Sequence, residues 1–142
     1  MPTALVYRRG AFYVGNLSTF PVSPGNSKIS RRGQVEVWAT GFTTILGLAF
    51  DKQGRLHVLK TGAAPGFPTP NRRRVLRVKP GGTNEIIADS LFFPTGMTFG
   101  PDGKLHVSHK GFGPPVPGFG EILRISVPGA QCPDEDEGGE GN

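Results

Sequence analysis

The chain has 142 residues, including 22 glycines and 14 prolines, and a formal net charge of +5. No stretch free of Gly and Pro carries a sustained 3.6-residue apolar period, which excludes long helices. No apolar run approaches the ~20 residues that a membrane-spanning helix needs. The single cysteine, Cys132, excludes an internal disulfide and a cysteine-based zinc cluster.

The charge is unevenly distributed along the chain. Five of the eleven acidic residues stand in the last nine positions, so sixteen basic side chains face six acidic ones elsewhere, a balance of +10. We therefore predict a disordered, acidic, Gly-rich tail over residues 130–142. The basic residues before it are spread over several turns, which favours a solvated surface over a nucleic-acid interface.

The strongest signal is an internal repeat with a spacing of 49 residues. Phe50 matches Phe99, Gly54 matches Gly103, and the run Leu-His-Val at 56–58 recurs at 105–107. A weaker third copy opens the chain at residues 2–14, with a turn one residue shorter. Self-similarity at a period of this length is typical of repeat architectures.

Each copy predicts four short strands joined by hairpins. The first and second strands are joined by a tight turn, a long Gly/Pro loop follows, and a second tight turn joins the third and fourth strands. The third copy ends after its third strand, at Ile125. We therefore predict an all-β fold, a partial β-propeller of about 11 strands in about 2.75 four-stranded antiparallel blades. The blades cover about residues 2–42, 43–91 and 92–129, and the third lacks its outer strand.

Single residues within the repeat have expected roles. Gly47 and Gly96 are expected to permit close approach near the axis. The turns at 51–54 and 101–103 supply an Asp acceptor and a Gly able to take a positive φ. In the outermost strand, Val35 and Val37 alternate with Glu36, which predicts one solvent-exposed face.

Several motifs resemble those of one family. They are Gly-x-Leu-x-x-Phe-Pro at 15–21, Ala-Thr-Gly-Phe-Thr at 39–43, Pro-Thr-Gly-Met at 94–97 and Pro-Asp-Gly-Lys-Leu-His-Val-Ser at 101–108. Over about residues 2–128 the chain resembles the ScyD/ScyE family, bacterial NHL-like β-propeller proteins associated with scytonemin biosynthesis. The resemblance implies a six-bladed propeller, usually exported, without established catalytic residues.

The chain departs from that family pattern in three ways. It spans about half a ring, it shows no export signal, and Asn16 stands where the family often has Glu. The first two departures predict a C-terminal half or a truncated member and leave the localisation open. The third weakens the expectation of an acidic site.

Function is expected on the face that carries the long loops. The ligand-binding candidates there are Asn16, Phe20, Lys60, Phe67, His109, Phe112 and Phe119, and the phenylalanines could instead fill their own loops. A basic run, Arg72, Arg73 and Arg74, is expected at a solvated loop end. Tyr13, His57 and His106 recur at one repeat position, which indicates packing.

No catalytic residue, metal site or cofactor is predicted. The first strands offer no Asp, Glu or Asn for a cation near the axis, and neighbouring Ser108 and His109 should point to opposite faces of their strand. The favoured function is a non-enzymatic propeller module that binds a small molecule or a protein on its loop face. The alternatives are the remnant of a lactonase or strictosidine-synthase-like hydrolase and a fragment without independent function. Exposed blade faces predict a homodimer or pairing with a missing N-terminal half.

Overall fold

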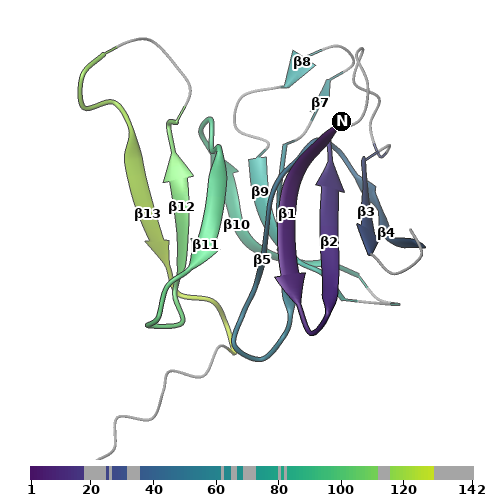
Figure 1. Cartoon of the computed structure of the whole chain (residues 1–142). Coiled ribbons are helices and arrows are strands. Elements are labelled where there is room, and N and C mark those ends of the chain that lie inside the picture. Colours follow the sequence, from purple (N-terminus) through teal and green to yellow (C-terminus); the bar gives the residue numbers. More distant parts are fainter. Residues whose placement is uncertain are drawn as a thin grey trace, which may run out of the picture.

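The computed structural model describes residues 1–17, 25, 27–31, 36–61, 63–64, 67–68, 73–79, 81, 83–111 and 116–129. Of residues 63, 64, 67 and 68 it describes the backbone alone. All regular elements in these ranges are strands (Figure 1). The same ranges contain no helix long and apolar enough to cross a bilayer.

Three antiparallel sheets follow one another along the chain. The N-terminal sheet contains β1 (Pro2–Arg8), β2 (Ala11–Asn16), β3 (Ser27–Arg31) and β4 (Glu36–Phe42). The central sheet contains β5 (Ile45–Phe50), β6 (Leu56–Lys60), β9 (Arg73–Arg77) and β10 (Glu85–Leu91). The C-terminal sheet contains β11 (Gly96–Phe99), β12 (Leu105–His109) and β13 (Glu121–Ile125). The prediction of an all-β chain with eleven antiparallel strands grouped four, four and three is confirmed.

One further hairpin was not predicted. Strands β7 (Ala63–Ala64) and β8 (Phe67–Pro68) pair with each other between β6 and β9 and form a two-stranded sheet of their own. Two-residue strands are too short to show an alternating pattern, so the sequence carries no signal for them.

The strand registers reproduce the 49-residue repeat. Gly47 pairs with Leu59 and Phe50 with Leu56 in the central sheet, and Gly96 pairs with Ser108 and Phe99 with Leu105 in the C-terminal sheet. Adding 49 to each number of the first set gives the second. The N-terminal sheet follows the same scheme, with Leu5 opposite Val14 and Tyr7 opposite Phe12.

The turns between the first two strands of the central and C-terminal sheets have the predicted chemistry. Gly54 and Gly103 have φ values of +83° and +72°, which glycine adopts without a steric penalty. Asp51 Oδ1 accepts a hydrogen bond from Arg55 N at 2.9 Å, and Asp102 Oδ1 accepts one from Lys104 N at 3.0 Å.

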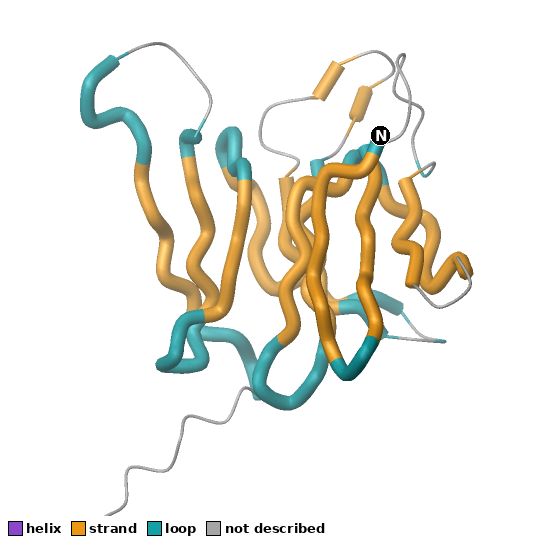
Figure 2. Tube along the Cα trace, in the orientation of Figure 1, coloured by secondary structure: helices purple, strands orange, loops and turns teal. Residues whose placement is uncertain are grey.

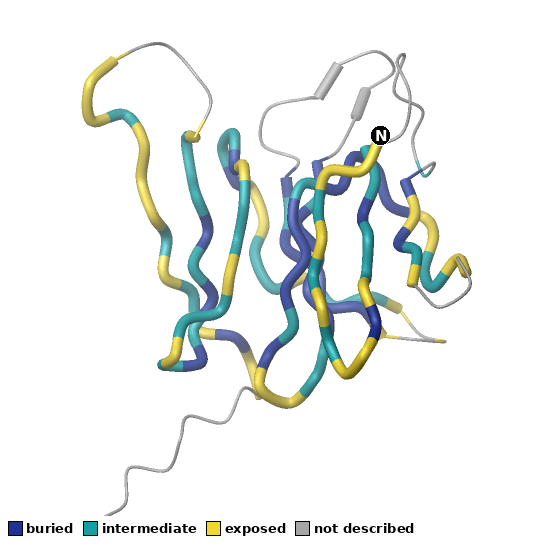
Figure 3. Tube along the Cα trace, in the orientation of Figure 1, coloured by how far each residue is buried: buried dark blue, intermediate teal, exposed yellow. Residues whose placement is uncertain are grey.

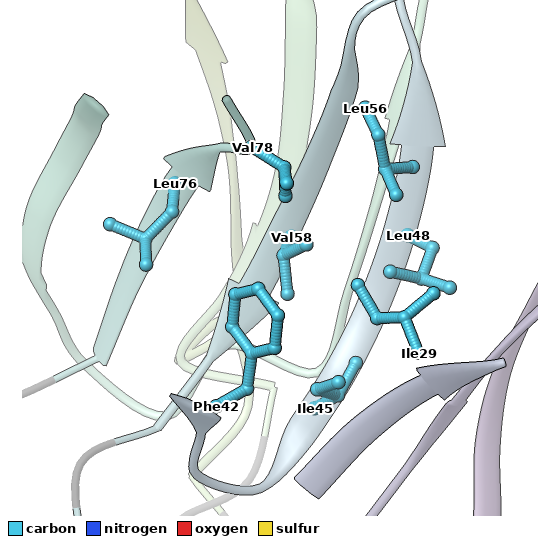
Figure 4. Packing of buried hydrophobic residues seen from close by; sticks show 8 residues of the cluster. All are labelled: Ile29, Phe42, Ile45, Leu48, Leu56, Val58, Leu76 and Val78. Atoms are coloured by element: carbon cyan, nitrogen blue, oxygen red, sulfur yellow. The ribbon is translucent and has the colours of Figure 1, made fainter. Parts of the chain in front are cut away.

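The sheets pack face to face in chain order, and β5 contacts both β1 and β11. One cluster of buried side chains joins the N-terminal and central sheets; it consists of Ile29, Phe42, Ile45, Leu48, Leu56, Val58, Leu76 and Val78 (Figure 4). A second cluster joins the central and C-terminal sheets; it consists of Leu59, Val75, Leu91, Leu105, Val107 and Val127. The central sheet is therefore covered on both faces, and the buried segments gather on it (Figure 3).

Two expectations about single positions are wrong. A Cβ added at Gly47 would lie 3.3 Å from the Cγ of Met97, but one added at Gly96 would meet no atom within 4 Å. Val37 was expected on the buried side of its strand, yet it is exposed. Gly96 lies on an end sheet, where one face has no further sheet packed against it among the described residues. Ile86, at the position of the central sheet equivalent to Val37, is exposed as well, so the exposure of Val37 belongs to the outermost strand of the sheet.

Candidate functional site

Three predicted site residues end equivalent strands. Asn16 is the last residue of β2, Lys60 of β6 and His109 of β12. We call this end of the sheets the loop face. The tight turns that follow β1, β5 and β11 lie at the opposite end, at the bottom of the view (Figure 2). Among the described segments, the ends of these second strands and the tight turns therefore lie at opposite ends of the sheets.

Some predicted site residues lie outside the described part of the chain. These are Phe20, Arg72 and Phe112, and of Phe67 only the backbone, in β8, is described. The predicted tail at 130–142 is outside it as well.

Asn16 ties two strands of the N-terminal sheet together. Its Oδ1 accepts a hydrogen bond from the backbone N–H of Lys28 at 2.9 Å, in the neighbouring strand β3. The amide oxygen is thus already engaged in holding β2 beside β3.

His109 is held by hydrogen bonds at both ring nitrogens. Its Nε2 accepts from the backbone N–H of Phe92 at 2.9 Å, so the ring proton of the neutral form lies on Nδ1 and faces Glu121 Oε2 at 3.1 Å. Lys110 Nζ donates to the other oxygen of Glu121, Oε1, at 2.5 Å. Hydrogen bonds from Lys110 and His109 lower the pKa of Glu121 below its ordinary value.

Phe119 belongs to a continuous series of contacts across the loop face. Lys110 Nζ lies 5.6 Å from the centroid of the Phe119 ring, and the Phe119 and Phe92 centroids are 6.4 Å apart. Phe92 stacks edge to face on Phe93 at 4.7 Å, and the guanidinium carbon of Arg73 lies 4.0 Å from the Phe93 centroid. We call these five residues the loop-face strip; it links the central and C-terminal sheets.

Arg73 forms the inner end of this strip. Its relative exposure is 2%, and its Nη1 has no hydrogen-bond partner among the described residues. Burial lowers the pKa of Arg73 below its ordinary value, because desolvation disfavours the charged form. A buried guanidinium with an unused donor is suited to an anionic group.

A second cationic group lies beside it in the central sheet. Lys60 pairs in register with Arg74, and Arg74 Nε donates to Asp89 Oδ1 at 2.9 Å. Burial and the charge of Arg74 lower the pKa of Lys60, while Asp89 opposes the shift. The expectation of a solvated basic run is therefore wrong for Arg73, which is buried on Phe93, while Arg74 is partly exposed and paired with Asp89.

The structure connects some of the predicted residues and not others. His109, Phe119 and Arg73 are joined through Phe92 and Phe93, whereas no contact among the described residues joins Asn16 to this group. Sequence reasoning missed four participants: Phe92, Phe93, Lys110 and Glu121. The only local signal was the pair Phe92–Phe93 before Pro94, an apolar pair at the start of a connection.

The described residues contain no group of three or more His, Cys, Asp or Glu side chains placed to hold a metal ion. Ser108 Oγ accepts a hydrogen bond from Thr95 Oγ1 at 3.0 Å, while both nitrogens of His109 are engaged elsewhere. The observed contacts therefore do not make Ser108 and His109 a nucleophile–base pair.

Comparisons of the chain with protein-family models, with curated proteins and with solved structures give no match.

Proposed function

We propose that the chain is a β-propeller module of the NHL-like, ScyD/ScyE type, and that its three sheets are consecutive blades. The support is the four, four and three grouping of the strands, the shared register of the first hairpins and the packing of each sheet on the next through β1, β5 and β11. Ring closure and family membership are parts of this proposal.

The function that we propose for the module is non-enzymatic binding on its loop face, with a small molecule as the ligand. The single observation that carries this is the loop-face strip, in which Arg73 and Lys110 flank three phenylalanine rings. Aromatic faces supply apolar contact area, and the cations select negative charge. An aromatic carboxylate fits both features.

Binding can be tested with indole-3-acetate as the probe and ¹⁵N-resolved NMR as the readout. We expect chemical-shift changes at His109, Lys110 and Arg73, and affinity that falls about tenfold in Lys110→Gln, the order of one lost charge-assisted contact. Lys104→Gln, in the turn at the opposite end, is the matched control and should bind as the original chain does. Shifts confined to the turn end would contradict the proposal.

Catalysis can be tested separately with a panel of lactones and esters, assayed with and without Ca²⁺ or Zn²⁺. The proposal expects no turnover above buffer. Metal-dependent turnover that saturates with substrate would refute the binding-only function and favour the hydrolase alternative.

A further inference from the structure

The two internal interfaces between sheets use the same repeat positions. In the first, the ring of Tyr13 meets Phe50 with centroids 4.9 Å apart and planes at 73°. In the second, His57 meets Phe99 at 4.9 Å and 70°. Tyr13 and His57 are equivalent in the repeat, as are Phe50 and Phe99. One packing mode is thus used twice.

The outer face of the N-terminal sheet carries the receiving half of this interface. Four of its positions have equivalents in both later sheets. In the N-terminal sheet they are Leu5, Tyr7, Phe12 and Val14; in the central sheet, Leu48, Phe50, Leu56 and Val58; and in the C-terminal sheet, Met97, Phe99, Leu105 and Val107. Those later residues pack against the preceding sheet. Leu5 and Tyr7 are instead 64% and 60% exposed.

The outer face of the C-terminal sheet carries the complementary half. Its residues are equivalent to those that line the side of the central sheet facing β11–β13. They are Gly96, Thr98, His106, Ser108 and Ile122, in the positions of Gly47, Ala49, His57, Leu59 and Val75. Ile122 is 69% exposed, and these five residues help line a shallow pocket. The exposed strand β13 forms the free left side of the molecule (Figure 3).

We infer that a second copy of this chain covers these faces, with the outer face of the N-terminal sheet of one copy packed on the outer face of the C-terminal sheet of the other. Repeating the internal interface brings Tyr7 of one copy onto His106 of the other, as Phe50 meets Tyr13. It also places Leu5 over Gly96, as Met97 lies over Gly47.

The contact is head to tail, because the two faces differ. Such contacts close into rings or grow into filaments. The inferred contact between copies rests only on the way the three sheets pack on one another. The closure of two copies into a ring rests also on the proposed propeller, in which two three-sheet halves make one ring. The binding test above reads the loop face only, so failure of one proposal is distinguishable from failure of the other.

The test measures the mass of the full chain by sedimentation and light scattering across a range of concentrations. We expect a dimer of about twice the chain mass of 15.1 kDa. Gly96→Leu should reduce it to a folded monomer, because a Cβ at this position meets no atom within 4 Å in its own copy, while the leucine side chain occupies the space of Leu5 from the other. Tyr7→Asp should do the same from the opposite face.

Two further samples make the test specific. Ile86→Asp changes an apolar residue of the central sheet that is 52% exposed, away from both outer faces, and should remain a dimer. An equimolar mixture of Gly96→Leu and Tyr7→Asp should regain dimer mass, because one intact pair of faces remains between the two variants.

Three outcomes would overturn the inference. They are a wild-type chain that stays monomeric at all concentrations, a dimer that survives both variants, and a dimer that Tyr7→Asp abolishes but Gly96→Leu does not. The last would show that two N-terminal sheets meet face to face.

Discussion

His57 shows how the repeat places a titratable side chain in the interior. The side chain is fully buried, its Nδ1 lies 3.1 Å from the carbonyl oxygen of Arg55, and its Nε2 has no hydrogen-bond partner among the described residues. Because a carbonyl can only accept, the proton of the neutral ring lies on Nδ1. Tyr13 at the same position packs on Trp38 and Phe50, so this position serves packing in both sheets.

The burial of His57 predicts that stability depends on pH. Desolvation lowers the pKa of His57, while the hydrogen bond to Arg55 and the charge of Asp51 oppose the shift. The pKa of the folded state therefore lies below the unfolded value of about 6.5. As the pH falls below that value the unfolded chain takes up the proton first, so the free energy of unfolding decreases toward acid; above it the contribution is flat.

Urea denaturation between pH 5 and pH 8 measures this dependence. In His57→Phe the acid-side slope should diminish, because the group that titrates differently in the two states is gone. His106→Gln, at the equivalent position of the next repeat, leaves His57 in place and should keep the slope. Identical slopes in the original chain and in His57→Phe would contradict the argument.

At this scale the sequence was informative wherever the chemistry is local. The Asp and Gly residues of the turns were predicted, because a turn requires its residue types at fixed offsets. The pair of His109 and Glu121 was not, since the two residues are twelve positions apart and meet only through the register of β12 with β13. Likewise, nothing along the chain indicates that Arg73 packs on Phe93.

Among the elements, strand positions were predictable and the burial of their faces was not. The repeat fixed which segments pair, because equivalent segments share one hairpin register. Burial depends in addition on which sheet packs on each face. Leu5 is therefore exposed despite its apolar side chain, whereas Leu48, at the equivalent position of the central sheet, is buried.

Ile45 begins β5, the strand that contacts both neighbouring sheets, and it is fully buried in the first cluster. Truncation to alanine removes its packing within that cluster, so Ile45→Ala should cost about 2–5 kcal/mol of unfolding free energy. Ile86→Ala makes the same change where the side chain is 52% exposed, and should stay within about 0.5 kcal/mol of the original chain. Chemical denaturation of both variants checks this, and equal losses would show that β5 is not central to the stack.

On the scale of the whole molecule, stability comes from a stack and not from one central core. The two buried clusters lie on opposite faces of the central sheet, and each end sheet contributes to one of them only. In such arrays stability is approximately a sum of terms within each unit and terms between neighbours. An end sheet with an open apolar face lacks one of these terms, which is the energetic reason for a second copy to pack on it.

Net charge is the other property of the whole chain. The last ten residues carry five acidic and no basic side chains, so deleting residues 133–142 changes the net charge from +5 to +10. Attraction to a polyanion grows with positive charge and is screened by salt. The shortened chain should therefore elute later from immobilised heparin at 0.1 M salt, and the difference should vanish near 1 M. A full-length chain with the five acids changed to Asn or Gln carries the same net charge of +10 and should elute like the shortened chain. If it elutes like the original chain, the tail acts through something other than its charge.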